Sequence, residues 1–507
     1  MSKTIIDLPS ELITSIVTYL DPQDVFSLRL SAKTLEGAIF AHFGKRFFRK
    51  KGYMLTSPSL AVLQHVADHI ELRKFVQHVW FSPDCYTYRR PDCVPKGNDR
   101  IHSMSPGDRA KFKAYEECMK DYFSLIENTA CQLQKVLVVA FAKLPNLKIL
   151  GMRRCRVGLP WGWRRLKDAV GCDPGALGRV TTGSKSRLTT PTLLFVALIN
   201  ATSSSGITLR RLYTNAIELD NIRPDLLSQD TLNKACNPIW YLEVDVTRGW
   251  LKARPNLRSV DYITPRHPKW EDGIGLRRLI QSCTSLKEID LQMRPDHEPP
   301  RTRPDLDDLD DLDVLEKFLE SGPYQCFRNT INKLSMRSLD RIKLERIIAS
   351  PTDLLAFLQP SAQTLTSLKL REVRLVSDDN PSRPWQPIFE FLHSSAHNLE
   401  SILFHHLLSA YGALCFVRVI QPTPFADDED GDGEADPSDS HFTDYGNNDI
   451  TLQADSSGLG GKEGVRWRLG ETIKRHYYQS GPWWRGRLPK YDLDDAVWHT
   501  DTSDEEW

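Results

Sequence analysis

The chain has 507 residues, of which 40% are hydrophobic and 26% are charged, values typical of a folded chain with more than one domain rather than of a disordered one. Lysine plus arginine and aspartate plus glutamate both number 66, so the zero net charge gives no indication of a nucleic-acid or anionic-membrane partner. The longest apolar run, near residues 193–201, is too short to span a bilayer, and the first residues do not resemble a secretory leader. We therefore expect an intracellular protein, cytoplasmic or nuclear.

The ten cysteines form no CxxC pair, so their spacing predicts no zinc or thioredoxin-like site. Cys85, Cys93 and His102 are close in sequence, but the gaps between them match no standard metal site. We expect reduced thiols that pack as small apolar side chains, and no metal or other cofactor.

The first fifty residues predict three short helices. Leu12, Ile16 and Leu20 recur every four residues, with Ile13 and Val17 beside them, which is the pattern of one apolar helix face. In a second helix, Asp21 caps the start, Pro22 takes the first helical position and Asp24 lies in the first turn. A third helix is indicated by the four-residue spacing of Leu35, Ile39 and Phe43.

The order of residue types in this region is more specific than their spacing. LPSELITSIVTYLDPQDVFSLRL, residues 8–30, resembles the F-box, whose pattern is LPxEL, an aliphatic residue, YL, a polar turn and a Leu-rich second helix. Segments like residues 42–48, 53–56 and 59–63 often follow the F-box in fungal proteins, so the resemblance extends from residue 5 to about residue 80. A departure lies in residues 33–38, where many F-boxes carry a Trp or Cys.

The resemblance implies an apolar face that binds the Skp-type adaptor of a cullin–RING ubiquitin ligase. It assigns the following residues to that interface or to its support: Leu8, Pro9, Leu12, Ile16, Tyr19, Leu20, Leu28 and Leu30. The alternative interpretation is that these side chains form only the core of the three helices.

A loose repeat, L-x-x-L-x-L-x-x followed by Asn, Cys or an apolar residue, begins near residue 130, with a helical segment before most copies. The copies are Leu147, Leu150, Met152 and Cys155; Leu209, Leu212, Thr214 and Ile217; Leu257, Val260 and Tyr262; Leu286, Ile289 and Leu291; Ile331, Leu334, Met336 and Leu339; Leu365, Leu368, Leu370 and Val373; and Leu399, Ile402, Phe404 and Leu407. The pattern resembles the divergent leucine-rich repeats found behind many F-boxes. It predicts an α/β fold in which a three-helix F-box precedes a degenerate leucine-rich-repeat solenoid.

Residues between the apolar strand positions would lie on the concave face of such a solenoid. Among them, Lys333, Arg337, Lys369 and Arg371 would form a basic patch suited to an acidic or phosphorylated target segment. The alternative is a solvated face whose charges only maintain solubility.

The sequence divides into five segments: residues 1–52 as F-box, 53–130 as helical connector, 131–420 as repeat body, 421–464 as disordered acidic linker, and 465–507 as an aromatic segment. We expect this last segment to cap the final repeat, and the alternative is a short recognition tail. Residues 427–439 hold eight acidic and no basic residues, which is the composition of a disordered insertion. Their Asp spacing imitates a calcium-binding loop, but the flanking sequence predicts no helices to pre-order one.

Catalytic motifs are absent from the sequence, so we expect no enzyme activity. The prediction is a substrate-recognition adaptor of a Skp–cullin–F-box ubiquitin ligase, in which the repeat body binds an unknown target protein and other subunits perform the chemistry. The alternative is a leucine-rich-repeat scaffold with no role in ubiquitin transfer.

Overall fold

The computed structural model describes residues 5–84, 86, 104–126, 131–153, 159–174, 190–217, 222, 224–247, 273–294, 322–332, 334, 339–376, 383–409, 413–415, 449–453 and 477–479. These residues belong to two compact units, Met1–Glu243 with Ser282–Ser285, and Val244–Gln281 with Leu286–Trp507.

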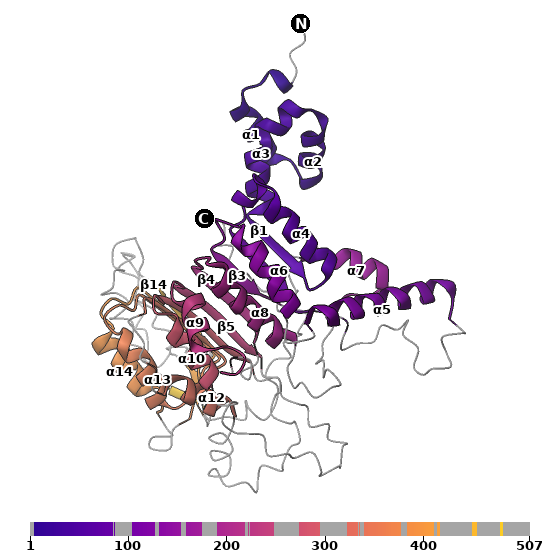
Figure 1. Ribbon diagram of the computed structural model, residues 1–507. Coiled ribbons are helices and arrows are strands. Elements are labelled where there is room, and N and C mark those ends of the chain that lie inside the picture. The colour runs from indigo at the N-terminus through magenta and orange to yellow at the C-terminus, as the bar shows by residue number, and fades with distance from the viewer. Residues whose placement is uncertain are drawn as a thin grey trace, which may run out of the picture. The chain divides into compact units, whose positions relative to one another are not determined.

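Three helices form the N-terminal bundle, as the sequence predicts. After η1 (Ile5–Asp7) come α1 (Ser10–Tyr19), α2 (Pro22–Ser31) and α3 (Lys33–Phe48), labelled in Figure 1. The predicted cap is confirmed, because the Asp21 carboxylate accepts a hydrogen bond from the Asp24 N–H at 2.9 Å and Pro22 opens α2. The core consists of Ile13, Val17, Val25, Leu35, Ile39 and Phe43.

The rest of the first unit is a parallel sheet with helices. Strands β1 (Lys50–Met54), β2 (His78–Ser82), β3 (Ile149–Met152) and β4 (Arg211–Ile217) pair in that order. Strand β5 (Tyr241–Thr247) follows β4 along the chain and has residues in both units. The helical elements between the strands are α4 (Ser57–Asp68), η2 (Leu72–Lys74), α5 (Pro106–Ile126), α6 (Cys131–Ala142), α7 (Trp163–Val170), α8 (Thr190–Ser205) and α9 (Gln229–Cys236).

Alternation along these strands places one set of side chains against the helices. Val79, Phe81, Leu150 and Leu212 are buried, and the ring of Phe81 lies 6.4 Å from that of Phe141 in α6. Because β2 lies within residues 53–130, that segment supplies a strand to the sheet as well as helices. The sheet therefore begins before residue 131, the predicted start of the repeat body.

The second unit repeats a helix followed by a strand. Its elements are α10 (Ile274–Ser282), β6 (Glu288–Arg294), α12 (Gly322–Ile331), β7 (Arg341–Glu345), β8 (Ile348–Ala349), α13 (Pro351–Leu358), η7 (Gln359–Ser361), β9 (Ser367–Arg371), β10 (Arg374–Leu375), α14 (Gln386–Ser395), β11 (Ser401–His405), β12 (Leu408–Ser409), β13 (Ala413–Cys415), β14 (Asp449–Gln453) and β15 (Tyr477–Gln479). Strands β6, β7, β9 and β11 are parallel neighbours, and β14 pairs antiparallel with β11. The two-residue strands β8, β10 and β12 form a second parallel ladder.

The predicted strand positions are confirmed for five of the copies, which coincide with β3, β4, β6, β9 and β11. The copy placed at Ile331 is wrong, because Ile331 ends helix α12 and the strand that follows is β7. The buried residues there are Leu339, Ile342, Leu344 and Ile347, which fit the same pattern eight residues later. The copy at residues 257–262 lies outside the described residues, and β5 was not predicted.

The prediction of a disordered linker over 421–464 is wrong in part, because β14 lies inside it and pairs with β11 over five residues. In the aromatic C-terminal segment, β15 pairs antiparallel with β13, so this part of the tail does add to the sheet of the short strands. The acidic residues 427–439 and the tail tryptophans lie outside the described residues.

Candidate functional site

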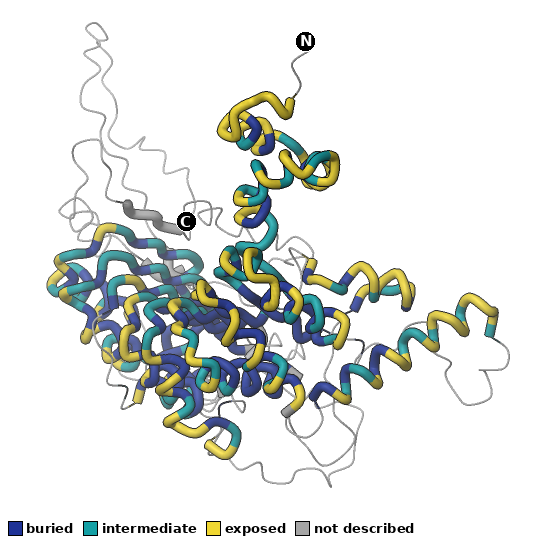
Figure 2. The backbone as a smooth tube through the Cα atoms, turned by 45° about the horizontal axis from the view of Figure 1, so that its top comes forward, coloured by how far each residue is buried: buried dark blue, intermediate teal, exposed yellow. Residues whose placement is uncertain are grey.

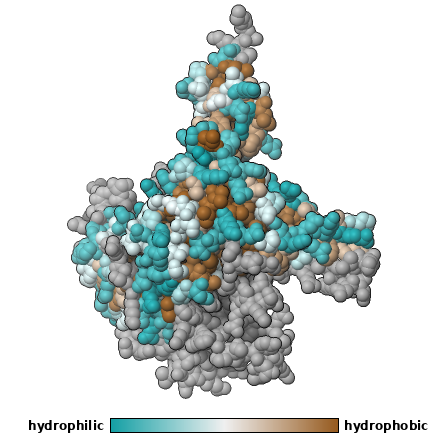
Figure 3. Space-filling view, in the orientation of Figure 1, coloured by the Kyte–Doolittle hydropathy of each residue, from teal (hydrophilic) through white to brown (hydrophobic). Residues whose placement is uncertain are grey.

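Helix α1 carries a row of exposed apolar side chains. Leu8 precedes the helix, and Leu12, Ile16 and Tyr19 follow at intervals of three or four residues, so all four share one face. Leu12 is 52% exposed and Tyr19 is 88% exposed. In Figure 2 much of this bundle is drawn as exposed, and in Figure 3 hydrophobic side chains lie open on its surface. Leu30, on α2, is 85% exposed. We group it with Leu8, Leu12, Ile16 and Tyr19 under the name apolar face.

The bundle leaves this face uncovered because its core is small and already complete. Ile13 and Val17, on the other side of α1, are buried against α2 and α3. The Arg46 guanidinium donates to the Val17 carbonyl at 3.2 Å and to the Leu20 carbonyl at 2.9 Å, which ties the C-terminal end of α1 to α3. The apolar face is therefore held by a fixed scaffold and is not part of its core.

Three of the eight residues that the resemblance singled out have other surroundings. Leu20 and Leu28 are partly buried and pack against the bundle core, so they support the helices. Pro9 is exposed and stands at the N-cap position of α1, one residue before the first helical position.

Sequence reasoning missed three exposed apolar residues beside this set: Ile5, Ile6 and Phe26. Phe26 is 44% exposed although its ring packs 4.9 Å from that of Phe47. A signal existed for Phe26, since it follows the buried Val25 directly, and neighbouring residues of a helix point in different directions.

The second predicted site, the basic patch of the repeat body, has a different character. Lys333 and Arg337 lie outside the described residues, while Lys369 and Arg371 lie on β9. Arg371 approaches the Glu345 carboxylate at 3.9 Å and the Glu372 carboxylate at 3.8 Å.

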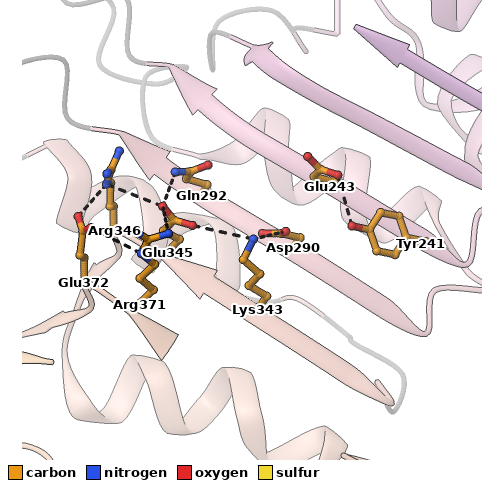
Figure 4. A network of polar contacts seen from close by, with 9 residues as sticks. All are labelled: Tyr241, Glu243, Asp290, Gln292, Lys343, Glu345, Arg346, Arg371 and Glu372. Carbon is orange, nitrogen blue, oxygen red and sulfur yellow. Dashed lines mark hydrogen bonds and ion pairs between the residues drawn. The ribbon is translucent and has the colours of Figure 1, made fainter. Parts of the chain in front are cut away.

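Neighbouring ion pairs on and beside β6, β7 and β9 also join charges of opposite sign. Lys343 pairs with Asp290 at 2.8 Å, and the Arg346 guanidinium donates to Glu372 at 2.7 Å, as Figure 4 shows. Burial opposes the charge on Glu372, but the hydrogen bond and charge of Arg346, with the charges of Arg371 and His405, leave the pKa of Glu372 below its ordinary value. The described part of this surface holds paired charges of both signs, so it is not a uniformly basic patch.

Within the described ranges, there is no cluster of three or more potential metal ligands. Of the helices that the structure describes, none combines the length and apolar character needed to cross a membrane. Cys118, Cys236, Cys283 and Cys326 are buried and unbridged, and Cys85 and Cys93 lie outside the described residues. A hydrogen bond with Cys236, followed by burial, raises the pKa of the Cys283 thiol well above its ordinary value, so this thiol is protonated at neutral pH.

In a comparison with known families, residues 5–39 match the F-box domain family. A search of curated proteins finds no similar chain. The matched residues contain η1, α1, α2 and the first part of α3, and thus the whole apolar face. Residues 5–39 of this α/β protein are therefore an F-box domain.

Proposed function

We propose that this protein is a substrate-recognition adaptor of a Skp–cullin–F-box ubiquitin ligase, working in the cytoplasm, the nucleus or both. The observation that carries the proposal is the apolar face of an F-box domain, exposed on a bundle whose own core is already closed. F-box domains typically bind Skp-type adaptors, and an exposed cluster of large apolar side chains marks an interface. Leu8, Leu12, Ile16, Tyr19 and Leu30 contact the adaptor in this proposal, while Leu20 and Leu28 support them.

Burial of the apolar face at an interface contributes enough free energy to support binding. Full burial of one Leu, Ile or Tyr side chain contributes about 1.5–3 kcal/mol, and the face offers Leu12, Tyr19 and Leu30 with more than half of each side chain exposed. Part of that gain is offset by the lost freedom of the two proteins. Few side chains therefore carry most of the affinity, which makes single helix faces testable by mutation.

The remainder of the chain selects the target in this proposal. Parallel strands preceded by helices repeat along the chain, with the apolar strand positions buried and polar positions on the other face. That arrangement supports a degenerate leucine-rich-repeat body, whose polar face binds a protein target. The chain supplies binding and proximity, and the other ligase subunits perform ubiquitin transfer.

The test is co-purification of the full chain with a Skp-type adaptor. Leu12→Asp combined with Ile16→Asp places two charges on the apolar face, and we expect adaptor binding to fall at least 100-fold. Thr18→Asp combined with Gln23→Asp is the matched control, because both residues are exposed polar positions off that face and the charge change is the same.

Retained adaptor binding in the first double variant would refute the proposed interface. Circular dichroism of both variants checks that the chain stays folded. Ubiquitination of bound proteins in a reconstituted ligase distinguishes the adaptor from the alternative scaffold, since a scaffold without a role in ubiquitin transfer binds the Skp-type adaptor but supports no ubiquitin transfer to its target.

A further inference from the structure

The face of the first-unit sheet opposite the helices carries aromatic rings set over glycines. Gly52 on β1 is the register partner of Trp80 on β2, and Gly151 on β3 is the partner of Tyr213 on β4. A Cβ on Gly52 would lie 2.2 Å from the Trp80 ring, and one on Gly151 would lie 2.0 Å from Tyr213 Cζ. Each ring therefore lies flat over a neighbouring strand, in space that only glycine leaves.

Two arginine side chains lie over aromatic rings of this sheet, those of Tyr213 on β4 and Tyr241 on β5. The Arg153 guanidinium is 5.3 Å from the centre of the Tyr213 ring, and that of Arg211 is 4.2 Å from the centre of the Tyr241 ring. A guanidinium attracted to the face of an aromatic ring still has N–H groups that can donate to an acceptor.

The surroundings of His78, on β2 beside Tyr213, have a positive electrostatic potential. Its Nε2 lies 2.8 Å from the Tyr213 hydroxyl. Burial, and then the charges of Lys50, Arg211, Arg153 and Arg49, lower the pKa of His78 from 6.5 to about 3. The imidazole is therefore neutral at pH 7, and the positive charge around it comes from the lysine and the arginines.

Arg153 and Arg211 lack carboxylate partners within the described ranges. Of the carboxylates in the described ranges, none lies within ion-pair distance of Arg153 or Arg211, and the buried Nε of Arg211 has no hydrogen-bond acceptor. Glu243 instead accepts a hydrogen bond from the Tyr241 hydroxyl at 3.3 Å. On the polar strands of the second unit, by contrast, Arg346 and Arg371 both have carboxylate neighbours.

We propose that the surface formed by Lys50, His78, Arg153, Arg211 and Tyr213, here called the Arg153–Arg211 surface, binds a carboxylate side chain on an extended acidic segment of the target protein. The proposal rests on the proposed function, which it deepens by naming the chemistry of the target. A carboxylate is planar and accepts two parallel N–H bonds from a guanidinium edge. It also carries one charge, so its burial against tyrosine rings costs less than that of a phosphate dianion.

Fluorescence anisotropy with a defined probe tests the proposal on the full chain. The probe is a fluorescein-labelled decapeptide of alternating glutamate and alanine, compared with its glutamine and phosphoserine counterparts. Arg153→Gln combined with Arg211→Gln should weaken binding of the glutamate peptide about 100-fold, since each charge-assisted contact is worth about tenfold or more. Arg109→Gln combined with Lys120→Gln, on exposed positions of α5, removes the same charge and should leave affinity within about twofold.

A second variant guards against misfolding of the first. Arg153→Lys combined with Arg211→Lys keeps the charge but loses the planar, two-point contact, and we expect about tenfold weaker binding. Equal binding of the glutamine peptide, equal losses in the α5 control, or binding of the phosphoserine peptide alone would each overturn the proposal.

Adaptor co-purification, measured on the same variants, separates this inference from the proposed function. Variants that keep both adaptor and peptide binding overturn the Arg153–Arg211 surface and leave the proposed function standing. A wild-type chain that binds the peptide through these arginines but no adaptor overturns the proposed function and leaves a surface for acidic peptides.

Discussion

Gly151→Ala tests whether the rings on the first-unit sheet depend on glycine. The new Cβ would lie 2.0 Å from Tyr213 Cζ and 2.4 Å from both Cε atoms, whereas carbon atoms normally approach to about 3.5–4 Å. The Tyr213 ring must therefore leave its position, because the other side of the contact is strand backbone.

The expected loss of stability follows from the contacts that the Tyr213 ring makes. Its movement breaks the hydrogen bond to His78, worth about 0.5–1.5 kcal/mol, and the contact with Arg153, worth about 0.5–1 kcal/mol. Repacking a crowded site adds about 1–3 kcal/mol. We expect Gly151→Ala to lower the local free energy of unfolding by about 2–5.5 kcal/mol.

Hydrogen exchange measured by mass spectrometry on β3 and β4 reports this local stability within the full chain. In a Tyr213→Ala background the clash is gone, so the same Gly151→Ala change should cost less than about 1 kcal/mol. Gly37→Ala is the matched control, because no atom lies within 4 Å of its added Cβ and alanine favours the helix by about 0.5–1 kcal/mol. Equal losses from Gly151→Ala with and without Tyr213 would refute the reasoning.

Three further predictions concern pH and the bundle core. The folded-state pKa of His78 lies below its unfolded value, so the unfolded state takes up a proton first as pH falls below about 6.5. The free energy of unfolding should therefore drop by up to about 1.4 kcal/mol per pH unit towards pH 4. His78→Gln should flatten this slope in acid denaturation curves. The pKa of Glu372 is also lowered, here by Arg346, so the pair stabilises above the unfolded pKa of about 4.5 and is lost in more acidic solution; because both side chains are partly exposed, Glu372→Gln should cost only about 1 kcal/mol at pH 7 in urea denaturation and less at pH 3. Ile39 is fully buried, so Ile39→Ala should destabilise the bundle by about 2–4 kcal/mol and weaken adaptor binding in proportion to the unfolded fraction measured by circular dichroism.

The N-terminal bundle could be predicted because each local signal agrees with the others. The cap at Asp21, the proline after it and the four-residue spacing of Leu35, Ile39 and Phe43 all specify the same helices. The exposure of Leu12 and the packing of Leu20 on the core could not be predicted in the same way. Both lie four residues from Ile16, but Leu20 packs on the core because the chain turns there into α2.

Residues 331–339 show where the spacing of apolar residues alone fails to predict the structure. Ile331 and Leu334 are three residues apart, a separation shared by a helix face and by the first two positions of the repeat, so the pattern did not distinguish the end of α12 from a strand. Which arginines have a carboxylate neighbour could not be predicted from the sequence either. Arg371 and Arg211 are both arginines between apolar strand residues, but only the register of the sheet places Glu345 beside Arg371.

The three copies over residues 339–407, two of which the spacing placed correctly, share a feature of their backbones. Arg346, Glu372 and His406, one after each of β7, β9 and β11, have φ of 58°, 52° and 48°, a left-handed conformation that costs a non-glycine residue about 1–3 kcal/mol. Such strain persists where neighbouring structure compensates for it. Here the Arg346 N–H donates to the Arg371 carbonyl at 2.9 Å, and the Glu372 N–H donates to the His405 carbonyl at 2.7 Å. The bends at Arg346 and Glu372 are each held by a hydrogen bond to the next copy, so the spacing of apolar residues is constrained from one copy to the next, and the periodicity in the sequence reflects that contact.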